Sequence, residues 1–154
     1  MCQGAGGLET LLKSAPALLK SAPPPLIAPT NCSSAHSSHK KENALTRDLG
    51  TYWLSSYGNV KNEWMIWDFK KPCFISQIFV GDSKHDCSLK NFALHVETKD
   101  GNFRKVKTFT KQRTNSIESF SGFLHYTQKV KLVFQDNHGT SSGQHILVAH
   151  VSFG

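Results

Sequence analysis

Five basic side chains lie within ten residues of one another, with no acidic residue among them. They are Arg104, Lys105, Lys107, Lys111 and Arg113, with Phe103 and Phe109 interleaved. Such a segment could face an anionic partner, namely a nucleic acid, a phosphate-bearing surface or an acidic protein. On a strand, neighbouring residues point to opposite faces, so the five charges cannot all share one face. The simpler interpretation, which we weigh more heavily, is an exposed edge strand whose lysines prevent aggregation.

Two groups of residues contain the side chains that zinc prefers, cysteine and histidine. The first is Cys32, His36 and His39, without a clear fourth ligand, and the second is Cys73 with His85, Asp86 and Cys87. In a chain that is not secreted, the cysteines are better interpreted as free thiols and the histidines as polar loop residues. We therefore expect no metal site and no cofactor.

Features of catalysis are scarce. The chain has no phosphate-binding Gly-rich loop before a helix and no His-Glu-x-x-His motif. Its carboxylates are scattered among lysines and arginines, with no close pair that suggests an acid/base couple. We expect a protein that is not an enzyme and has no catalytic residues.

Length and composition limit the remaining classes. The chain has 154 residues, 38% hydrophobic and 19% charged, which suits one domain with a buried core. The formal net charge of +7 favours contact with anionic surfaces. No apolar run approaches the roughly 18 residues of a membrane-spanning helix, and the first residues lack the pattern of a secretory signal. We expect an intracellular, cytoplasmic protein that does not span a membrane.

The elements that must position these residues are strands. Beyond residue 40, apolar and polar residues alternate, as in strands with one buried face. The clearest examples are 65–69, 92–96, 130–134 and 149–153, and 74–80 is apolar enough for a strand covered on both sides. Asp100-Gly101 between two alternating segments predicts a hairpin. Without a helical period over three turns, the pattern predicts an all-β antiparallel sandwich or jelly roll of about seven or eight strands.

Composition changes near residue 40. Five of the six prolines fall in the first 30 residues, where the sequence Leu-Leu-Lys-Ser-Ala-Pro occurs twice. Proline has no amide donor and favours extended backbone. We predict a flexible Pro/Ser/Ala-rich tail over 1–39 and a β-sandwich domain over 40–154. The alternative for the tail is a docking peptide for a proline-recognising partner.

Nine short motifs follow one another in a recognisable order. They lie at 44–45, 51–56, 64–72, 75–78, 92–97, 120–123, 130–134, 137–139 and 149–154. In this order they resemble the coagulation factor 5/8 type C family, also called the discoidin domain, a galactose-binding-like jelly roll. The resemblance covers roughly residues 40–154. Fold alone does not determine which ligand such a domain binds.

The resemblance implies a non-catalytic binding module that contacts a glycan, a phospholipid headgroup or a protein through loops at one end of the sandwich. In this chain the candidate loop residues are Tyr52, Leu54, Tyr57, Asn59, Asn137 and His138. A sugar site needs an aromatic platform and a few convergent hydrogen-bonding groups, and these residue types supply both. We expect Trp53 and Trp64, at matched motif positions, in the core. Ile66 and Val133 are apolar on the outward side of their strands, so they are either covered or part of an interaction surface.

Two departures from the family pattern narrow the choice. No cysteine follows Cys87, so the disulfide that joins the two ends of secreted members cannot form. Calcium-binding members carry an acidic residue where this chain has His150, and the loop at 46–50 contains one acid, Asp48. Calcium needs several oxygen ligands, so we expect none here. Both departures point to intracellular members of the family, which mostly bind proteins.

We therefore predict a protein–protein interaction module that uses its end loops. The first alternative is a carbohydrate-binding lectin, whose affinity would be insensitive to salt. The second alternative is a binder of nucleic acid or anionic lipid through the 104–113 segment, whose affinity would fall steeply with salt.

Overall fold

The structure of the protein, a computed structural model, describes residues 22–45, 47–139 and 143–154. Its elements are, in chain order, β1 (Asn31–Cys32), the 3-10 helix η1 (Lys41–Leu45), β2 (Trp53–Leu54), β3 (Glu63–Ile75), β4 (Ile78–Gly81), β5 (Asn91–Glu97), β6 (Phe103–Thr110), β7 (Ile117–Phe120), β8 (His125–Phe134), β9 (Leu147–Val148) and β10 (His150–Phe153). The part of the predicted tail at 1–21 lies outside the described residues. Within those residues, no helix has the length and hydropathy of a membrane span.

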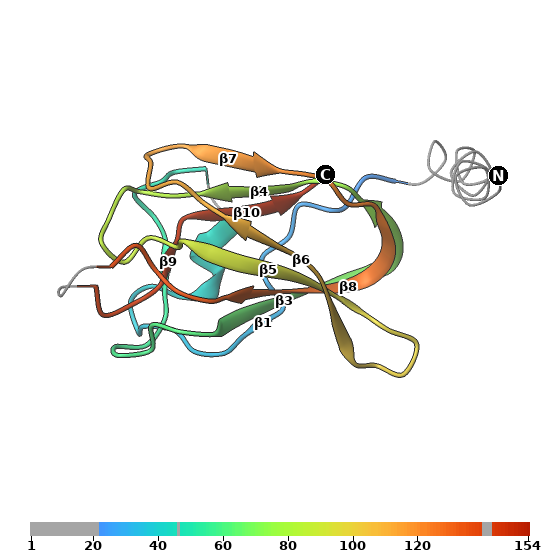
Figure 1. The fold of residues 1–154 in the computed structure, drawn as a ribbon, viewed down its shortest axis with the longest axis horizontal. Helices are drawn as coiled ribbons and strands as arrows, with labels where there is room; N and C mark the ends of the chain where they lie inside the picture. The colour runs from blue at the N-terminus through green and yellow to red at the C-terminus, as the bar shows by residue number, and fades with distance from the viewer. Residues whose placement is uncertain (1–21, 46, 140–142) are drawn as a thin grey trace, which may run out of the picture.

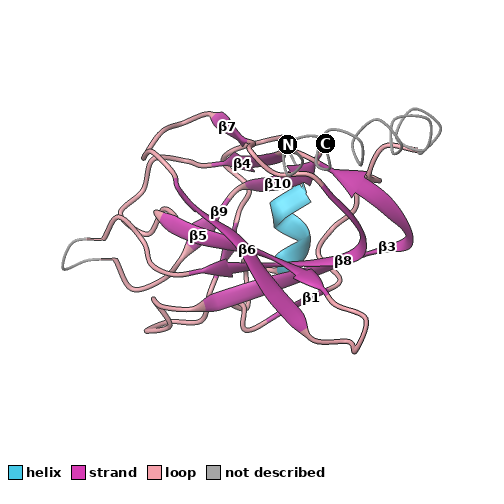
Figure 2. Cartoon of the chain, turned by 45° about the vertical axis from the view of Figure 1, so that its right-hand side comes forward, coloured by secondary structure: helices cyan, strands magenta, loops and turns pink. Residues whose placement is uncertain are grey.

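The strands form two layers. A five-stranded sheet in the order β1-β3-β8-β5-β6 faces a three-stranded sheet in the order β10-β4-β7 (Figure 1). Strands β2 and β9 pair as a short ribbon. All pairs between these strands are antiparallel, which confirms the predicted all-β sandwich. Figure 2 shows η1 between the layers, and its Ala44 is fully buried.

Alternation along β3 decides which side chains fill the core. Met65, Trp67 and Phe69 point inward and are at most 4% exposed. The rings of Trp67 and Phe69 pack edge-on against Phe153 of β10, with centroids 5.1 and 5.5 Å apart. Trp53 is also fully buried, as predicted. Burial of large apolar side chains is the main favourable term in folding, so these contacts between layers hold the sandwich together.

Trp64 lies outside this core, contrary to the prediction. It alternates with Met65, so it points to the outer face of the larger sheet, where it is half-buried. The ammonium group of Lys131 lies 5.0 Å from its ring centroid. Ile66 and Val133 share this outer face and are also half-buried. Successive side chains of β3 point to opposite faces. Because Met65 and Trp67 point into the core, Trp64 between Glu63 and Met65 alternates with them and points outward.

The segment 74–80 is two strands rather than the one predicted. β3 ends at Ile75 and β4 begins at Ile78. The amides of Ser76 and Gln77, between them, both donate to the carbonyl of Gly154, at 2.7 and 3.0 Å. The carbonyl of Gly154 thus accepts hydrogen bonds from both amides at the point where the chain passes from one layer to the other. By contrast, the predicted hairpin at Asp100-Gly101 is present, and Gly101 has a φ of +85°.

Part of the segment predicted as a flexible tail pairs with the larger sheet. β1 pairs with β3, matching Asn31 with Ile66 and Cys32 with Met65. Pro29 is buried, and Ile27 packs against the core. The alternation pattern missed this segment because a two-residue strand has no measurable period. A domain boundary at residue 40 therefore cuts through contacts that extend back to Ile27.

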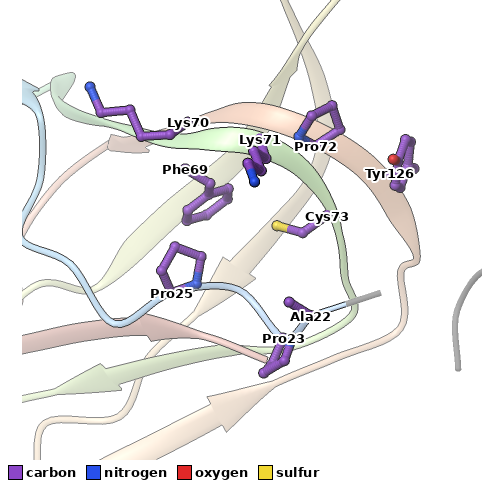
Figure 3. A pocket seen from close by; sticks show the side chains of 9 residues that line it. All are labelled: Ala22, Pro23, Pro25, Phe69, Lys70, Lys71, Pro72, Cys73 and Tyr126. Carbon is purple, nitrogen blue, oxygen red and sulfur yellow. The ribbon is translucent and has the colours of Figure 1, made fainter. Parts of the chain in front are cut away.

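A β-bulge interrupts β3 beside this segment. Between the pairs Asp68–Lys129 and Cys73–Thr127 the register shifts, and Lys70 has a φ of +72°. The bulge leaves a pocket of about 430 Å³. Figure 3 shows Ala22 and Pro25 on one side of it and Phe69 and Cys73 on the other. The proline-rich segment thus forms one wall of this pocket.

Candidate functional site

Three loops meet at the end of the sandwich where β2 pairs with β9. The amide of His36 donates to the carbonyl of Leu54 at 2.8 Å, and the amide of Ser55 donates to the carbonyl of Ile146 at 3.0 Å. The amide of Gly58 donates to the carbonyl of Gln144 at 2.8 Å. Backbone hydrogen bonds therefore tie the segments 34–39, 52–59 and 143–146 to one another.

Five aromatic rings gather on these loops, and we call them the end-loop cluster: His36, His39, Tyr52, Tyr57 and His145. Tyr52 stacks on His39, with centroids 4.8 Å apart and an interplanar angle of 3°. His36 contacts His39 at 5.2 Å and His145 at 5.7 Å, and His145 contacts Tyr57 at 5.6 Å. Tyr57 lies at the outside of this chain of rings and is 76% exposed. The cluster thus presents an aromatic surface to solvent.

The hydrogen bonds of two histidines define the polar groups of the cluster. His145 Nδ1 lies 2.7 Å from the carbonyl of Ser55, so this nitrogen carries the proton and Nε2 of the neutral ring is an acceptor. His36 Nδ1 accepts from the amide of Ser38 at 3.1 Å, so the proton of its neutral ring is on Nε2. The cluster can therefore both donate and accept hydrogen bonds.

The hydroxyl of Ser34 fixes the loop beneath the cluster. It donates to the carboxylate of Glu63, which is only 8% exposed. It accepts from the amide of Ser56 at 3.0 Å and from the side-chain amide of Asn59 at 3.3 Å. The indole of Trp53 donates to the Ser34 carbonyl at 3.0 Å. This network anchors the loop that carries Tyr57 to the core, so the ring surface is pre-organised.

Of the six candidate loop residues, Tyr52 and Tyr57 belong to the cluster and Asn59 lies in its supporting network. Leu54 is buried with Cys87 and Leu147, beneath the surface. Such a position supports the loop but does not offer the side chain to a ligand.

Asn137 and His138 have structural contacts. The side-chain amide of Asn137 donates to the carbonyl of His145 at 2.7 Å, which connects it directly to the end-loop cluster. His138 Nε2 donates to the backbone carbonyl of Lys111 at 2.8 Å. Both side chains hold loops in place through these bonds.

The three histidines are the residues that sequence reasoning missed. His36 and His39 were considered only with Cys32 as a metal group, and His145 was not singled out. Within the described residues, no group of three or more His, Cys, Asp or Glu side chains has the geometry to hold a metal ion. In the neutral ring of His36, Nδ1 accepts a hydrogen bond from Ser38 and Nε2 carries the proton. Neither nitrogen therefore has a free lone pair for a metal ion. No local signal in the sequence joins residue 36 to residue 145.

The five basic residues do not form one surface. A β-bulge shifts the register of β6 on β5, with Leu94 opposite Lys107 but His95 opposite Lys105. Lys105 therefore shares the outer face of the sheet with His95. Arg104 and Lys107 lie on the inner side, because their partners across the ladder are the buried Val96 and Leu94. Uniform alternation would place Phe103, Lys105, Lys107 and Phe109 on one face, but the extra residue at Val106 separates the first two from the last two.

Two of the five basic residues are occupied within the protein. Lys111 is fully buried, and its ammonium group lies 3.1 Å from the carboxylate of Asp82. Arg113 forms an ion pair with Asp86 at 2.8 Å. Lys111 cannot contact an external anion, which corrects its place in the predicted patch. Arg104, Lys105 and Lys107 remain exposed.

The sequence that follows β8 has the spacing Gly-x-Ser-x-Gly, from Gly139 to Gly143. In hydrolases this motif forms a sharp turn between a strand and a helix. Here the next described element after β8 is the two-residue strand β9. Residues 140–142, which include the serine of this spacing, lie outside the described residues.

Comparison with known proteins establishes the class of fold. Residues 26–91 match the family model of the XRCC1 N terminal domain. No curated protein matches the chain. Similar solved structures include the family 32 carbohydrate-binding module of NanJ from Clostridium perfringens in complex with galactose, at 12% identity and a TM-score of 0.67, covering 80% of this chain and 90% of that one.

Two further structures show the same likeness. CBM32-3 from a family 31 glycoside hydrolase of Clostridium perfringens has 14% identity and a TM-score of 0.72, covering 86% of this chain and 93% of that one. The CBM32 of AlyQ in complex with 4,5-unsaturated mannuronic acid has 17% identity and a TM-score of 0.68, covering 83% and 96%. The chain is therefore a galactose-binding-domain-like β-sandwich. The family model within this class is that of the XRCC1 N terminal domain, rather than factor 5/8 type C.

Proposed function

We propose that this chain is a non-catalytic module that binds a protein partner through the end-loop cluster. The observation that carries the proposal is Tyr57, which is 76% exposed at the end of a chain of contacting rings. Exposed tyrosines on rigid supports are typical hot spots of protein interfaces, because their large rings lose little conformational freedom on binding. The bonds of Ser34 and the backbone pairs of the three loops supply that rigidity.

The sequence match supports a protein ligand. It spans residues 26–91, which include four members of the end-loop cluster, and the matching model is a domain of XRCC1 rather than of a carbohydrate-active enzyme. Within the galactose-binding-like class, the motif order further supports a relation to the factor 5/8 type C family. An intracellular, cytoplasmic location belongs to the same proposal. Cys32, Cys73 and Cys87 are free thiols, as is usual in a reducing compartment.

Carbohydrate binding is the second candidate function. Tyr57 beside the acceptor nitrogen of His145 combines an aromatic platform with a hydrogen-bonding group, which sugar sites require. The similar solved structures are carbohydrate-binding modules, but at 12–17% identity they share only the fold. We rank this function second because the sequence match favours the other.

The test compares Tyr57→Ala with Tyr126→Ala. Tyr126 is a matched control, because it is 60% exposed and lies beside the β3 bulge, away from the end loops. Partners captured by crosslinking to the wild-type chain are identified, purified and titrated by calorimetry. We expect Tyr57→Ala to weaken binding by about 30-fold or more, as a hot spot does, and Tyr126→Ala to leave it unchanged.

A glycan array completes the test. Salt-resistant binding of one sugar class that is lost in Tyr57→Ala would replace the protein proposal with the carbohydrate one. If both tyrosine variants lost partner binding equally, the end-loop cluster would not be the binding site.

A further inference from the structure

Strand β6 forms one margin of the larger sheet (Figure 1). Among the described strands it pairs only with β5, so no described strand lies along its second edge. The amide of Lys111 donates to the carbonyl of Lys90, so the backbone of Lys111 faces β5. In an antiparallel pair, the backbone groups of successive residues point alternately toward and away from the partner strand. The amides and carbonyls of Thr108 and Thr110 therefore point away from β5. In the described part of the chain, no other backbone group bonds to residues 103–110. These amides and carbonyls are thus open to an additional strand.

The same alternation applies on the other side of the bulge. The amide of Thr98 donates to the carbonyl of Asn102 at 2.7 Å, so that pair is bonded and the backbone groups of Phe103 and Lys105 point outward. The free edge therefore offers two short sets of donors and acceptors, one on each side of Val106. A partner segment could pair with either set without disturbing the ladder to β5.

Positive charge flanks this edge on both faces of the sheet. The bulge at Val106 places Lys105 on the outer face and Arg104 and Lys107 on the inner side. All three side chains are exposed, and β6 itself contains no acidic residue. Among the described residues, none of the three forms an ion pair, although the ammonium group of Lys107 donates to the carbonyl of Ser121 at 3.3 Å.

We propose that the free edge of β6 binds an acidic, extended segment of a partner protein as an added strand. Successive side chains of a strand point to opposite faces, so neighbouring acidic residues would reach Lys105 on one face and Arg104 or Lys107 on the other. The segment is therefore a run of consecutive Asp and Glu residues rather than an alternation of acidic and apolar ones. This surface is separate from the end-loop cluster and does not depend on it.

The experiment measures binding of a fluorescein-labelled ten-residue peptide to the full chain by fluorescence anisotropy at low ionic strength. The peptide carries consecutive Glu and Asp residues flanked by Val and Thr. A second peptide has the same sequence with N-methyl groups on alternate backbone amides, which keeps the charge but prevents strand pairing. We expect the N-methylated peptide to bind at least about tenfold more weakly.

Protein variants separate backbone pairing from charge. Thr108→Pro removes an outward amide, and proline is tolerated on edge strands because the ladder to β5 does not use that amide. Arg104→Glu/Lys105→Glu reverses two flanking charges. We expect each to weaken peptide binding about tenfold, whereas Lys61→Glu/Lys71→Glu, a change of equal charge at two other exposed lysines, alters it less than about twofold. Thermal unfolding checks that every variant folds.

Three results would overturn the proposal. Equal binding of the two peptides would show attraction by charge alone. Unchanged binding by folded Thr108→Pro would show that the edge does not pair. Tighter binding of a single-stranded oligonucleotide through the same residues would assign the surface to nucleic acid. Tyr57→Ala should leave peptide binding unchanged, so failure here is distinguishable from failure of the end-loop proposal.

Discussion

The ammonium group of Lys111 and the carboxylate of Asp82 form a buried pair, with the two side chains 0% and 1% exposed. The carboxylate also accepts hydrogen bonds from the amides of Thr114 and Lys84, at 3.1 and 3.2 Å. Lys111 donates a further bond to the carbonyl of Gln112 at 2.9 Å. Charges this far from water are tolerated only with such partners. The pair therefore joins the segment after β4 to the segment after β6.

Removal of one partner should strongly destabilise the fold. We expect Lys111→Met to lower the free energy of unfolding by about 3–5 kcal/mol, because it leaves the carboxylate of Asp82 buried without its counterion. Urea denaturation measures this loss. The double variant Asp82→Leu/Lys111→Met should cost less than the sum of the single variants, since no charge is left buried. A loss below about 1 kcal/mol in Lys111→Met would contradict the structural role.

At the scale of elements, β1 and the residues around it act as a clamp on the larger sheet and on the end loops. The amide of Thr30 donates to the carbonyl of Ile66 at 2.7 Å, and the hydroxyl of Thr30 accepts from the amide of Asp68 at 2.9 Å. Ser34 accepts the indole proton of the buried Trp53. The residues that flank this short strand thus add hydrogen bonds of their own to those of its ladder.

Two truncations test this clamp. A chain that begins at residue 40 should be at least about 2 kcal/mol less stable than one that begins at residue 26. It loses the burial of Ile27 and leaves the Trp53 indole without an acceptor, and each loss costs about 1–3 kcal/mol. Denaturant unfolding of the two chains compares them directly. Equal stability would place the domain boundary at residue 40.

At the scale of the whole molecule, the charge of +7 is distributed over several faces. Lys105 lies on the outer face with Lys131, Arg104 and Lys107 lie on the inner side, and Arg113 is paired with Asp86. Burial, together with the nearby charges of Lys131 and Lys105, lowers the pKa of His95, so this ring adds no charge to the outer face at neutral pH. No face therefore collects the five charges of the basic segment.

This distribution predicts a weak salt dependence of nucleic-acid binding. If all five basic residues contacted phosphates of a single strand, the logarithm of the affinity would fall with a slope of about −3.5 against the logarithm of the salt concentration. We expect a slope no steeper than about −1.5, because Lys111 and Arg113 are paired with Asp82 and Asp86, and at most two of the other three share one face. Anisotropy titrations of a labelled oligonucleotide at several salt concentrations measure the slope. A value near −3.5 would show that the basic residues converge in solution.

Local patterns in the sequence were sufficient for the class of fold. The period of two assigned Met65, Trp67 and Phe69 to one face, and Asp100-Gly101 identified a hairpin. These features depend on neighbours a few residues apart, so the sequence itself contains them. The same periodicity, applied to Trp64, would have placed it on the outer face; the motif resemblance assigned it to the core instead.

The arrangement of the surface was decided by tertiary structure. One extra residue at Val106 turns Lys105 away from Lys107, and burial against Asp82 removes Lys111 from the surface. His36, Tyr57 and His145 meet only because the β2–β9 ribbon brings their loops together. The sequence by itself determined which face of each strand is apolar, because that depends on local alternation. The structure determined which side chains share a site, because that depends on contacts between residues far apart in the sequence, such as Asp82 with Lys111 and His36 with His145.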